Sequence, residues 1–277
     1  MRLHSNKLTR DEVLLRHFPD VTPVEDAAVK GLSGGSCLIE HQGQRLVLRQ
    51  HHDSSAPDFH FRRQYHVLKA LPATLAPRPL GFYAGWMAVE YLQGETCATL
   101  PSSQPMAALL YHLHQQKGFG WRVTLLPLLQ HYWQNSSPLR RTPQWLRQLH
   151  RLRKQGEPQP LRLAPLHMDV HAGNLVTTTE GLRLIDWEYA GDGDVALELA
   201  AVWTADETSR AALIAEYARV AKMDSTALGL QVQRWQPWLN MLMTTWYEYR
   251  WQQTGDQHFI ALADEGWRGL MNKREER

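Results

Sequence analysis

The chain has 277 residues, of which 43% are hydrophobic and 21% charged, and this is the composition of an ordinary folded protein. A net charge of only +2 excludes a strong overall attraction to nucleic acid or membrane, and no apolar run is long enough to span a bilayer. We therefore expect neither nucleic acid nor a membrane as a partner. Cys37 and Cys97 are too few for a disulfide framework, and residues 1–18 lack a signal-peptide apolar run. A cytoplasmic location is expected.

Short elements dominate the first part of the chain. A capping box formed by Thr9 and Glu12 predicts a helix that ends before Pro19. Strands are predicted over residues 29–32, 37–41, 45–49, 80–83 and 86–90, and one main helix over residues 57–71. This pattern indicates a small antiparallel sheet accompanied by one main helix.

Beyond residue 94 the spacing of apolar residues becomes helical. Helices are predicted over residues 105–114, 123–134, 142–154, 194–203, 207–222, 224–253 and 256–272. Basic side chains cluster between residues 140 and 154, which is typical of a solvent-exposed helix face. We therefore expect two lobes, an N-terminal lobe over residues 1–92 and a helical C-terminal lobe over residues 93–277.

A polar stretch in the middle of the chain has the spacing that phosphoryl transfer requires. His167 and Asp169 are followed by Asn174, then by two short apolar segments, and then by Asp186. The Thr/Glu/Gly cluster between the apolar segments predicts a hairpin with a somewhat open loop. Asn174 and Asp186 are equally far from Glu180, so pairing about that residue would bring them side by side. Such a pair can hold one or two Mg²⁺ ions, with Asp169 nearby as a base.

The segment LHMDVHAGNLV, followed by LRLIDWEYAGDGD, resembles the signature of the aminoglycoside phosphotransferase and choline kinase family, and the likeness covers about residues 30–251. The resemblance implies an α+β, bilobed, protein-kinase-like fold. It also implies ATP-dependent phosphorylation of a small-molecule alcohol, with ATP and Mg²⁺ as cofactors. Thiamine is the implied acceptor and thiamine monophosphate the product. Choline, ethanolamine and aminoglycosides are the alternative acceptors within the family.

The family pattern, carried over position by position, gives each polar residue of this stretch a role. Asp169 corresponds to the catalytic base, and Asn174 and Asp186 correspond to the metal ligands. His167 corresponds to a structural histidine that supports the backbone near the metal-binding aspartate. Glu188 stands where many relatives have a second acidic residue, and it is a candidate for contact with substrate or, through water, with a metal.

The phosphates of the nucleotide are expected at a glycine-rich turn, because glycines allow backbone N–H groups to approach closely. The turn consists of Ser33, Gly34, Gly35 and Ser36. One strand later, Arg49 occupies the place of the phosphate-binding lysine of kinases, and Gln64 occupies that of its acidic partner. An arrangement of Arg49 with Gln64 is therefore expected in place of the usual Lys–Glu ion pair, because an amide can accept a bond from a guanidinium.

Adenine and the acceptor are expected at two other places. Residues 89–94 resemble the hinge between lobes, where the main chain of Glu90 and Leu92 would contact adenine. The Trp-rich tail, which begins at Trp235, has aromatic and apolar residues at helical spacing. A buried helix face is the favoured interpretation for each of these aromatic residues taken singly. The functional alternative is an aromatic wall for a cationic acceptor. Its candidates are Trp246, Tyr247, Glu248 and Trp251.

Two other classes of function fit parts of the sequence. A zinc-dependent hydrolase would use His167, Asp169 and His171 around a metal-bound water. That hypothesis leaves Asn174 and Asp186 without a role. A catalytically silent binding module is motivated by the replaced Lys–Glu pair.

Overall fold

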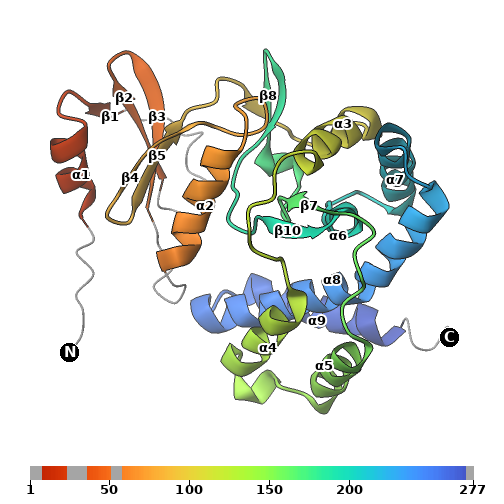
Figure 1. Cartoon of the computed structure of the whole chain (residues 1–277). Helices are drawn as coiled ribbons and strands as arrows, with labels where there is room; N and C mark the ends of the chain where they lie inside the picture. The colour runs from red at the N-terminus through yellow and green to blue at the C-terminus, as the bar shows by residue number, and fades with distance from the viewer. Residues whose placement is uncertain (1–7, 24–35, 51–57, 273–277) are drawn as a thin grey trace. The chain divides into compact units, whose positions relative to one another are not determined.

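The computed structural model describes residues 8–23, 36–50 and 58–272, and the chain folds as two compact units (Figure 1). The first unit consists of residues 1–119 and 167–190, and the second of residues 120–166 and 191–277. The lobe boundary at residue 92 stays a prediction. The predicted strand over residues 29–32 lies outside the described residues. In the part of the chain that is described, no helix combines the length and hydropathy needed to cross a membrane.

A five-stranded antiparallel sheet begins the first unit. Its strands are β1 (Thr22–Pro23), β2 (Ser36–His41), β3 (Gln44–Gln50), β4 (Pro79–Tyr83) and β5 (Trp86–Glu90), in the spatial order β1-β2-β3-β5-β4. Two-residue turns connect β2 to β3 at Gln42-Gly43 and β4 to β5 at Ala84-Gly85, and all four turn residues have positive φ. Such turns match the twist of the flanking strands, and the predicted strand pairs are confirmed.

The described α-helices of the first unit are α1 (Arg10–His17), α2 (Asp58–Ala70) and α3 (Ser103–His114). The predicted capping box opens α1: the Thr9 hydroxyl accepts from the Glu12 N–H, and the Glu12 carboxylate accepts from the Thr9 N–H. Val13 and Phe18 pack against Leu48 and neighbouring residues of the sheet. In Figure 1, α1 and α2 lie on opposite sides of this sheet.

The central hairpin is present, but its register differs from the prediction. It consists of β8 (Leu175–Thr178) and β9 (Gly181–Leu184), and β6 (Glu95–Thr96) adds to it in the order β6-β8-β9. Thr178 pairs with Gly181, so the loop is a tight two-residue turn and not an open one. Asn174 therefore faces Ile185, whose N–H donates to the Asn174 carbonyl at 3.0 Å. The predicted pairing of Asn174 with Asp186 is wrong by one residue, because it assumes a turn with an odd number of residues.

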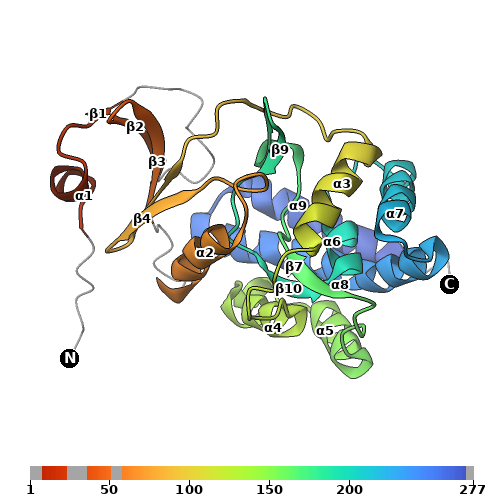
Figure 2. The same cartoon turned by 45° about the horizontal axis from the view of Figure 1, so that its top comes forward.

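The second unit is mainly helical. Its described α-helices are α4 (Leu125–Asn135), α5 (Pro143–Gln155), α6 (Val195–Ala201), α7 (Glu207–Ala221), α8 (Ser225–Thr254) and α9 (Gln257–Asn272). Each lies close to its predicted position, and α9 runs alongside α8 (Figure 2). Trp145, Tyr217 and Trp238 are fully buried in the core of this unit. Trp238 and the buried Trp235 are thus core residues, as helical spacing predicts.

A two-stranded ladder in the second unit escapes prediction. β7 (Leu163–Leu166) pairs antiparallel with β10 (Gly191–Asp194). The sequence GDGD has a low strand propensity, so the pattern of residues carries no strand signal there. The ladder runs from the pair Leu163–Asp194 to the pair Leu166–Gly191.

Asp194, the last residue of β10, is a buried hydrogen-bonding centre at one end of this ladder. One carboxylate oxygen accepts from the Leu161 N–H at 3.3 Å and from the Ala196 N–H at 3.2 Å. The other accepts from the Gln231 amide at 2.8 Å and from the Trp235 indole at 2.9 Å. Four donors compensate the loss of water around this side chain, which is only 1% exposed.

We predict that Asp194→Ala lowers the free energy of unfolding by about 2–4 kcal/mol, because it leaves buried donors without acceptors. Asp224→Ala is the matched control, since Asp224 also caps a helix of this unit but is exposed. Loss of that cap should cost about 1 kcal/mol. Urea unfolding followed by circular dichroism measures both changes, and equal losses in the two variants would contradict the prediction.

Candidate active site

Asp169 and Asn174 are in direct contact in the loop that follows β7. The Asn174 amide Nδ2 donates to the main-chain oxygen of Asp169 and to its carboxylate Oδ2, both at 3.0 Å. Met168, directly before Asp169, has a φ of 70°, in the left-handed region that non-glycine residues seldom adopt. Backbone strain of this kind concentrates at functional sites.

His167 is fully buried and connects this loop to the hairpin. Its Nδ1 accepts from the Asp169 N–H at 3.2 Å, and its Nε2 lies 2.9 Å from the Ile185 carbonyl oxygen. A main-chain N–H can only donate, so the ring proton lies on Nε2 and is donated to Ile185. Because the main chain engages both ring nitrogens, neither is available as a zinc ligand. Within the described ranges, no group of three or more His, Cys, Asp or Glu side chains is placed to hold a metal. The zinc-hydrolase hypothesis is therefore not favoured.

Asp186 follows Ile185 with a φ of 62° and carries a contact that the sequence pattern did not indicate. Its Oδ1 accepts from Arg49 Nη2 at 2.8 Å and from Gln64 Nε2 at 3.3 Å. Arg49 lies near the end of β3, and Gln64 is a buried residue of α2. The residues that stand for the usual Lys–Glu pair thus both donate to the same carboxylate oxygen.

The two aspartates have opposite pKa shifts. Burial raises the pKa of the Asp169 carboxyl above its usual value, and the nearby His171, with Nε2 3.7 Å from Asp169 Oδ2, offsets only part of this effect. Burial also acts on Asp186, but the charge and the hydrogen bond of Arg49 outweigh it, so the pKa of Asp186 is lowered. Asp169 is consequently the better proton acceptor, whereas Asp186 stays ionised.

Glu188 lies two residues beyond Asp186 at an exposed position. Desolvation of its carboxyl group, followed by the negative charge of Asp186, raises the pKa of Glu188 to about 7. The negative charge of Asp186 therefore favours the protonated form of Glu188.

The expected glycine-rich turn is only partly described. Ser33, Gly34 and Gly35 lie outside the described residues, whereas Ser36 is the first residue of β2. Ser36 pairs with Arg49 across the ladder between β2 and β3. The end of the expected turn is therefore directly beside Arg49.

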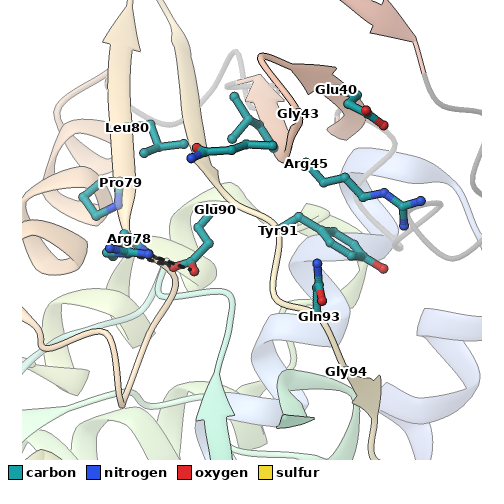
Figure 3. A pocket seen from close by; sticks show the side chains of 12 residues that line it. Glu40, Gly43, Arg45, Arg78, Pro79, Leu80, Glu90, Tyr91, Gln93 and Gly94 are labelled. Carbon is teal, nitrogen blue, oxygen red and sulfur yellow. Dashed lines mark hydrogen bonds and ion pairs between the residues drawn. The ribbon is translucent and has the colours of Figure 1, made fainter. Parts of the chain in front are cut away.

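Glu90 and Leu92 lie at the end of β5 and just beyond it. The Glu90 N–H donates to the Arg78 carbonyl at 2.9 Å, and the Glu90 carboxylate pairs with the Arg78 guanidinium at 3.3 Å. A cavity of about 960 Å³ opens beside this strand end (Figure 3). It is lined by Glu40, Gly43, Gln44, Arg45, Leu46, Arg78, Pro79, Leu80, Glu90, Tyr91, Gln93 and Gly94. Leu92 itself is buried.

Glu248, a candidate acceptor contact, lies in the second unit and is only 1% exposed. Its carboxylate accepts from Arg140 Nε at 3.0 Å and Nη2 at 2.8 Å. The Trp267 indole N–H donates to the same carboxylate at 2.9 Å. Both oxygens of Glu248 are thus occupied by partners in α9 and ahead of α5, which favours a structural role.

The tail aromatics of α8 lie at half-buried positions and pack against one another and against α9. Trp246 meets Tyr247 and Phe259 with ring centroids 5.4 and 5.7 Å away. The Arg250 guanidinium lies over the Trp246 ring at 5.8 Å from its centroid. The face of Trp246 therefore already attracts a cation, and Trp251 is also half-buried. Contact of these residues with an acceptor stays a prediction.

The fold and this constellation define a class of protein. The sequence profile of the phosphotransferase enzyme family matches residues 28–230, and the chain belongs to that family. It is 59% identical to the thiamine kinase of Salmonella paratyphi C (strain RKS4594) and 58% identical to the thiamine kinase of Salmonella typhimurium (strain LT2). Each alignment spans 98% of both chains.

Among solved structures, the choline kinase LicA from Streptococcus pneumoniae superposes with a TM-score of 0.71 at 15% identity. The match covers 95% of this chain and 97% of that one. The predicted α+β, kinase-like fold is thereby confirmed.

We predict that Asp169→Asn raises the melting temperature of the metal-free protein at pH 7. The folded protein raises the pKa of Asp169, so ionisation of this carboxyl costs stability above the unfolded-state pKa, and an amide removes that cost. The gain should shrink as the pH falls toward the ordinary pKa of an aspartate, where the carboxyl is protonated in both states. Thermal unfolding between pH 4 and 8 tests this, and a gain that is constant with pH would contradict it.

Proposed function

We propose that the protein transfers the γ-phosphoryl group of ATP to the hydroxyethyl group of thiamine, giving thiamine monophosphate and ADP. Such a reaction would serve the salvage of thiamine in the cytoplasm. The observation that carries the proposal is the joint presence of the Asp169–Asn174 contact and the ionised Asp186. These residues lie in a chain that aligns over 98% of its length with thiamine kinases.

Asp169 is the proposed proton acceptor. Phosphoryl transfer requires that the acceptor oxygen be aimed at the γ-phosphorus and lose its proton as the new bond forms. The new bond joins this oxygen to phosphorus, the bond from phosphorus to the bridging oxygen of ADP breaks, and Asp169 takes the proton. The pKa of Asp169 is raised toward neutral pH, and a carboxylate with a higher pKa is a more effective general base. The hydrogen bond from Asn174 keeps its carboxylate oriented.

Asn174 and Asp186 are the proposed ligands of Mg²⁺. The amide nitrogen of Asn174 is engaged by Asp169, so the amide oxygen is the atom that remains for a cation. Asp186 supplies a carboxylate that stays ionised. Oxygen atoms of this kind suit a hard cation such as Mg²⁺. When bound, the ion would neutralise charge on the phosphates, while these side chains hold it in place.

Strand β3 has the length to connect the two ends of a nucleotide. Arg45 borders the cavity at the end of β5, and Arg49 contacts Asp186. Arg49 is four residue steps along the strand from Arg45, which is roughly 13 Å at about 3.3 Å per step. We propose that adenine binds at the cavity end and that the phosphates lie by Arg49 and Ser36.

The main chain after β5 is the proposed adenine contact. The N–H of Glu90 already donates to the Arg78 carbonyl, so Glu90 would offer its carbonyl oxygen as the acceptor. Leu92, two residues further on, would offer its N–H as the donor. An acceptor and a donor at this spacing suit the edge of adenine.

Thiamine is the proposed acceptor because of the identity to thiamine kinases along nearly the whole chain. The likeness to choline kinases lies at the level of the fold and does not favour choline. Glu188 and the aromatic residues Trp246, Tyr247 and Trp251 stay candidates for contact with the cationic thiazolium ring. For Glu248, a structural role is favoured by its pairing with Arg140.

We predict that Asp169→Ala lowers the turnover of thiamine by about 10²–10⁴-fold, because general-base assistance is lost. Binding of ATP should persist, since Asp169 is not a proposed ligand of the nucleotide. Steady-state kinetics and calorimetric titration with ATP measure the two effects. The exposed Asp224→Ala serves as a control and should keep its turnover. Retention of most turnover in Asp169→Ala would refute the role of Asp169.

We predict that thiamine is phosphorylated in preference to choline, ethanolamine and aminoglycosides. ATP consumption against this panel, with the products identified by mass, measures the preference. A phosphorylated product from another alcohol and none from thiamine would refute thiamine as the acceptor while leaving the phosphotransferase class intact. No ATP turnover with any acceptor would support a silent binding module instead.

A further inference from the structure

Arg49 and Gln64 both donate hydrogen bonds to one oxygen atom of the Asp186 carboxylate, which the proposed reaction needs as a ligand for a cation. Arg49 Nη2 lies 2.8 Å and Gln64 Nε2 lies 3.3 Å from the same Asp186 Oδ1. A guanidinium only donates hydrogen bonds, and the Gln64 amide is turned so that it donates as well. Together they occupy the lone pairs of Oδ1, one of the two oxygens through which Asp186 would bind a metal.

The neutral residue at position 64 determines which carboxylate Arg49 contacts. A glutamate there would compete for the guanidinium, as in the Lys–Glu pair of kinases. Gln64 does not compete, and it adds a second donor to Asp186 instead. Among the residues that the structure describes, Asp186 is the carboxylate that Arg49 contacts. Both departures from the kinase pattern therefore act on one oxygen atom.

The surroundings make this contact difficult for a free cation to displace. The side chains of Arg49 and Asp186 are only 20% and 31% exposed, so water and salt screen their attraction less than at the surface. A divalent cation that approaches Asp186 also meets the positive charge of Arg49. A triphosphate, in contrast, offers the guanidinium an acceptor with more negative charge and with bidentate geometry.

We propose that Arg49 and Gln64 cap Asp186 in the nucleotide-free protein, and that the triphosphate of ATP draws Arg49 away and thereby frees Asp186 for the divalent cation. Affinity for the cation and affinity for ATP are then coupled, and each raises the other. This inference rests on the proposed use of ATP with a divalent cation, but it does not depend on thiamine as the acceptor.

Binding of Mn²⁺ to the full-length, nucleotide-free protein tests the cap, with the electron paramagnetic resonance signal of free Mn²⁺ as the readout. Arg49→Met should bind Mn²⁺ about tenfold more tightly than the wild type, because one charge-assisted hydrogen bond no longer competes. Gln64→Leu should shift the affinity in the same direction by less, since it removes a donor without changing the charge. Should Arg49→Met fail to fold, Gln64→Leu still tests the cap.

Binding of ATP in the presence of EDTA gives a second, opposite readout. Arg49→Met should bind metal-free ATP more weakly, because the phosphates lose a bidentate donor. The variant would therefore gain affinity for Mn²⁺ and lose affinity for ATP. General damage to the site lowers both affinities and would contradict the proposal.

Arg62→Met is the matched control for charge. Arg62 is an exposed residue of α2, two positions before Gln64 and therefore not on the same helix face, and its replacement lowers the net charge by the same amount. The Mn²⁺ affinity of this variant should stay within about twofold of the wild type, since exposed charges are screened. Equal gains in Arg62→Met and Arg49→Met, or none in Arg49→Met and Gln64→Leu, would overturn the cap. If the wild type binds no ATP, both the proposed function and the proposed cap on Asp186 are refuted.

Discussion

A closed circuit of four hydrogen bonds holds the reactive loop of this protein. The Asp169 N–H donates to the ring of His167, and the ring donates to the Ile185 carbonyl. The Ile185 N–H donates to the carbonyl of Asn174, whose side chain donates back to Asp169. Each residue of the circuit is positioned by the two beside it. Asp186, the next residue after Ile185, is positioned by the same circuit, so the base and the proposed metal ligands share one support.

The sequence predicted which residues form the candidate site and that a hairpin lies between Asn174 and Asp186. It did not predict the pairing register of that hairpin. The side chains of a strand alternate, so adding or removing one turn residue changes which residues face each other. Thr179-Glu180 lacks the Asn-Gly or Asp-Gly signal that identifies a two-residue turn, and Gly181, with a φ of 119°, closes the turn from inside the strand. The sequence pattern therefore suggested a longer loop and a pairing that is off by one residue.

The partners of Arg49 and Gln64 show another limit of sequence-based prediction. Local spacing marked both positions as departures from the kinase pattern, yet their contact with Asp186 joins residues 137 and 122 positions apart. Contacts at such separations depend on how the sheet and the hairpin pack, and residue periodicity carries no information about that packing. Asp194 is similar, since its four donors come from three separate segments of the chain. Helices and hairpins with strong local signals, in contrast, were predicted nearly in place.

The ladder between β7 and β10 has a consequence for how the reactive loop unfolds. The chain leaves the ladder at Leu166 and returns to it at Gly191, and these two residues face each other. Residues 167–190 therefore form a loop whose ends are already tied together, so most of the entropy of closing it is lost when the ladder forms. The ends of the segment that carries the reactive groups therefore stay together for as long as the ladder persists.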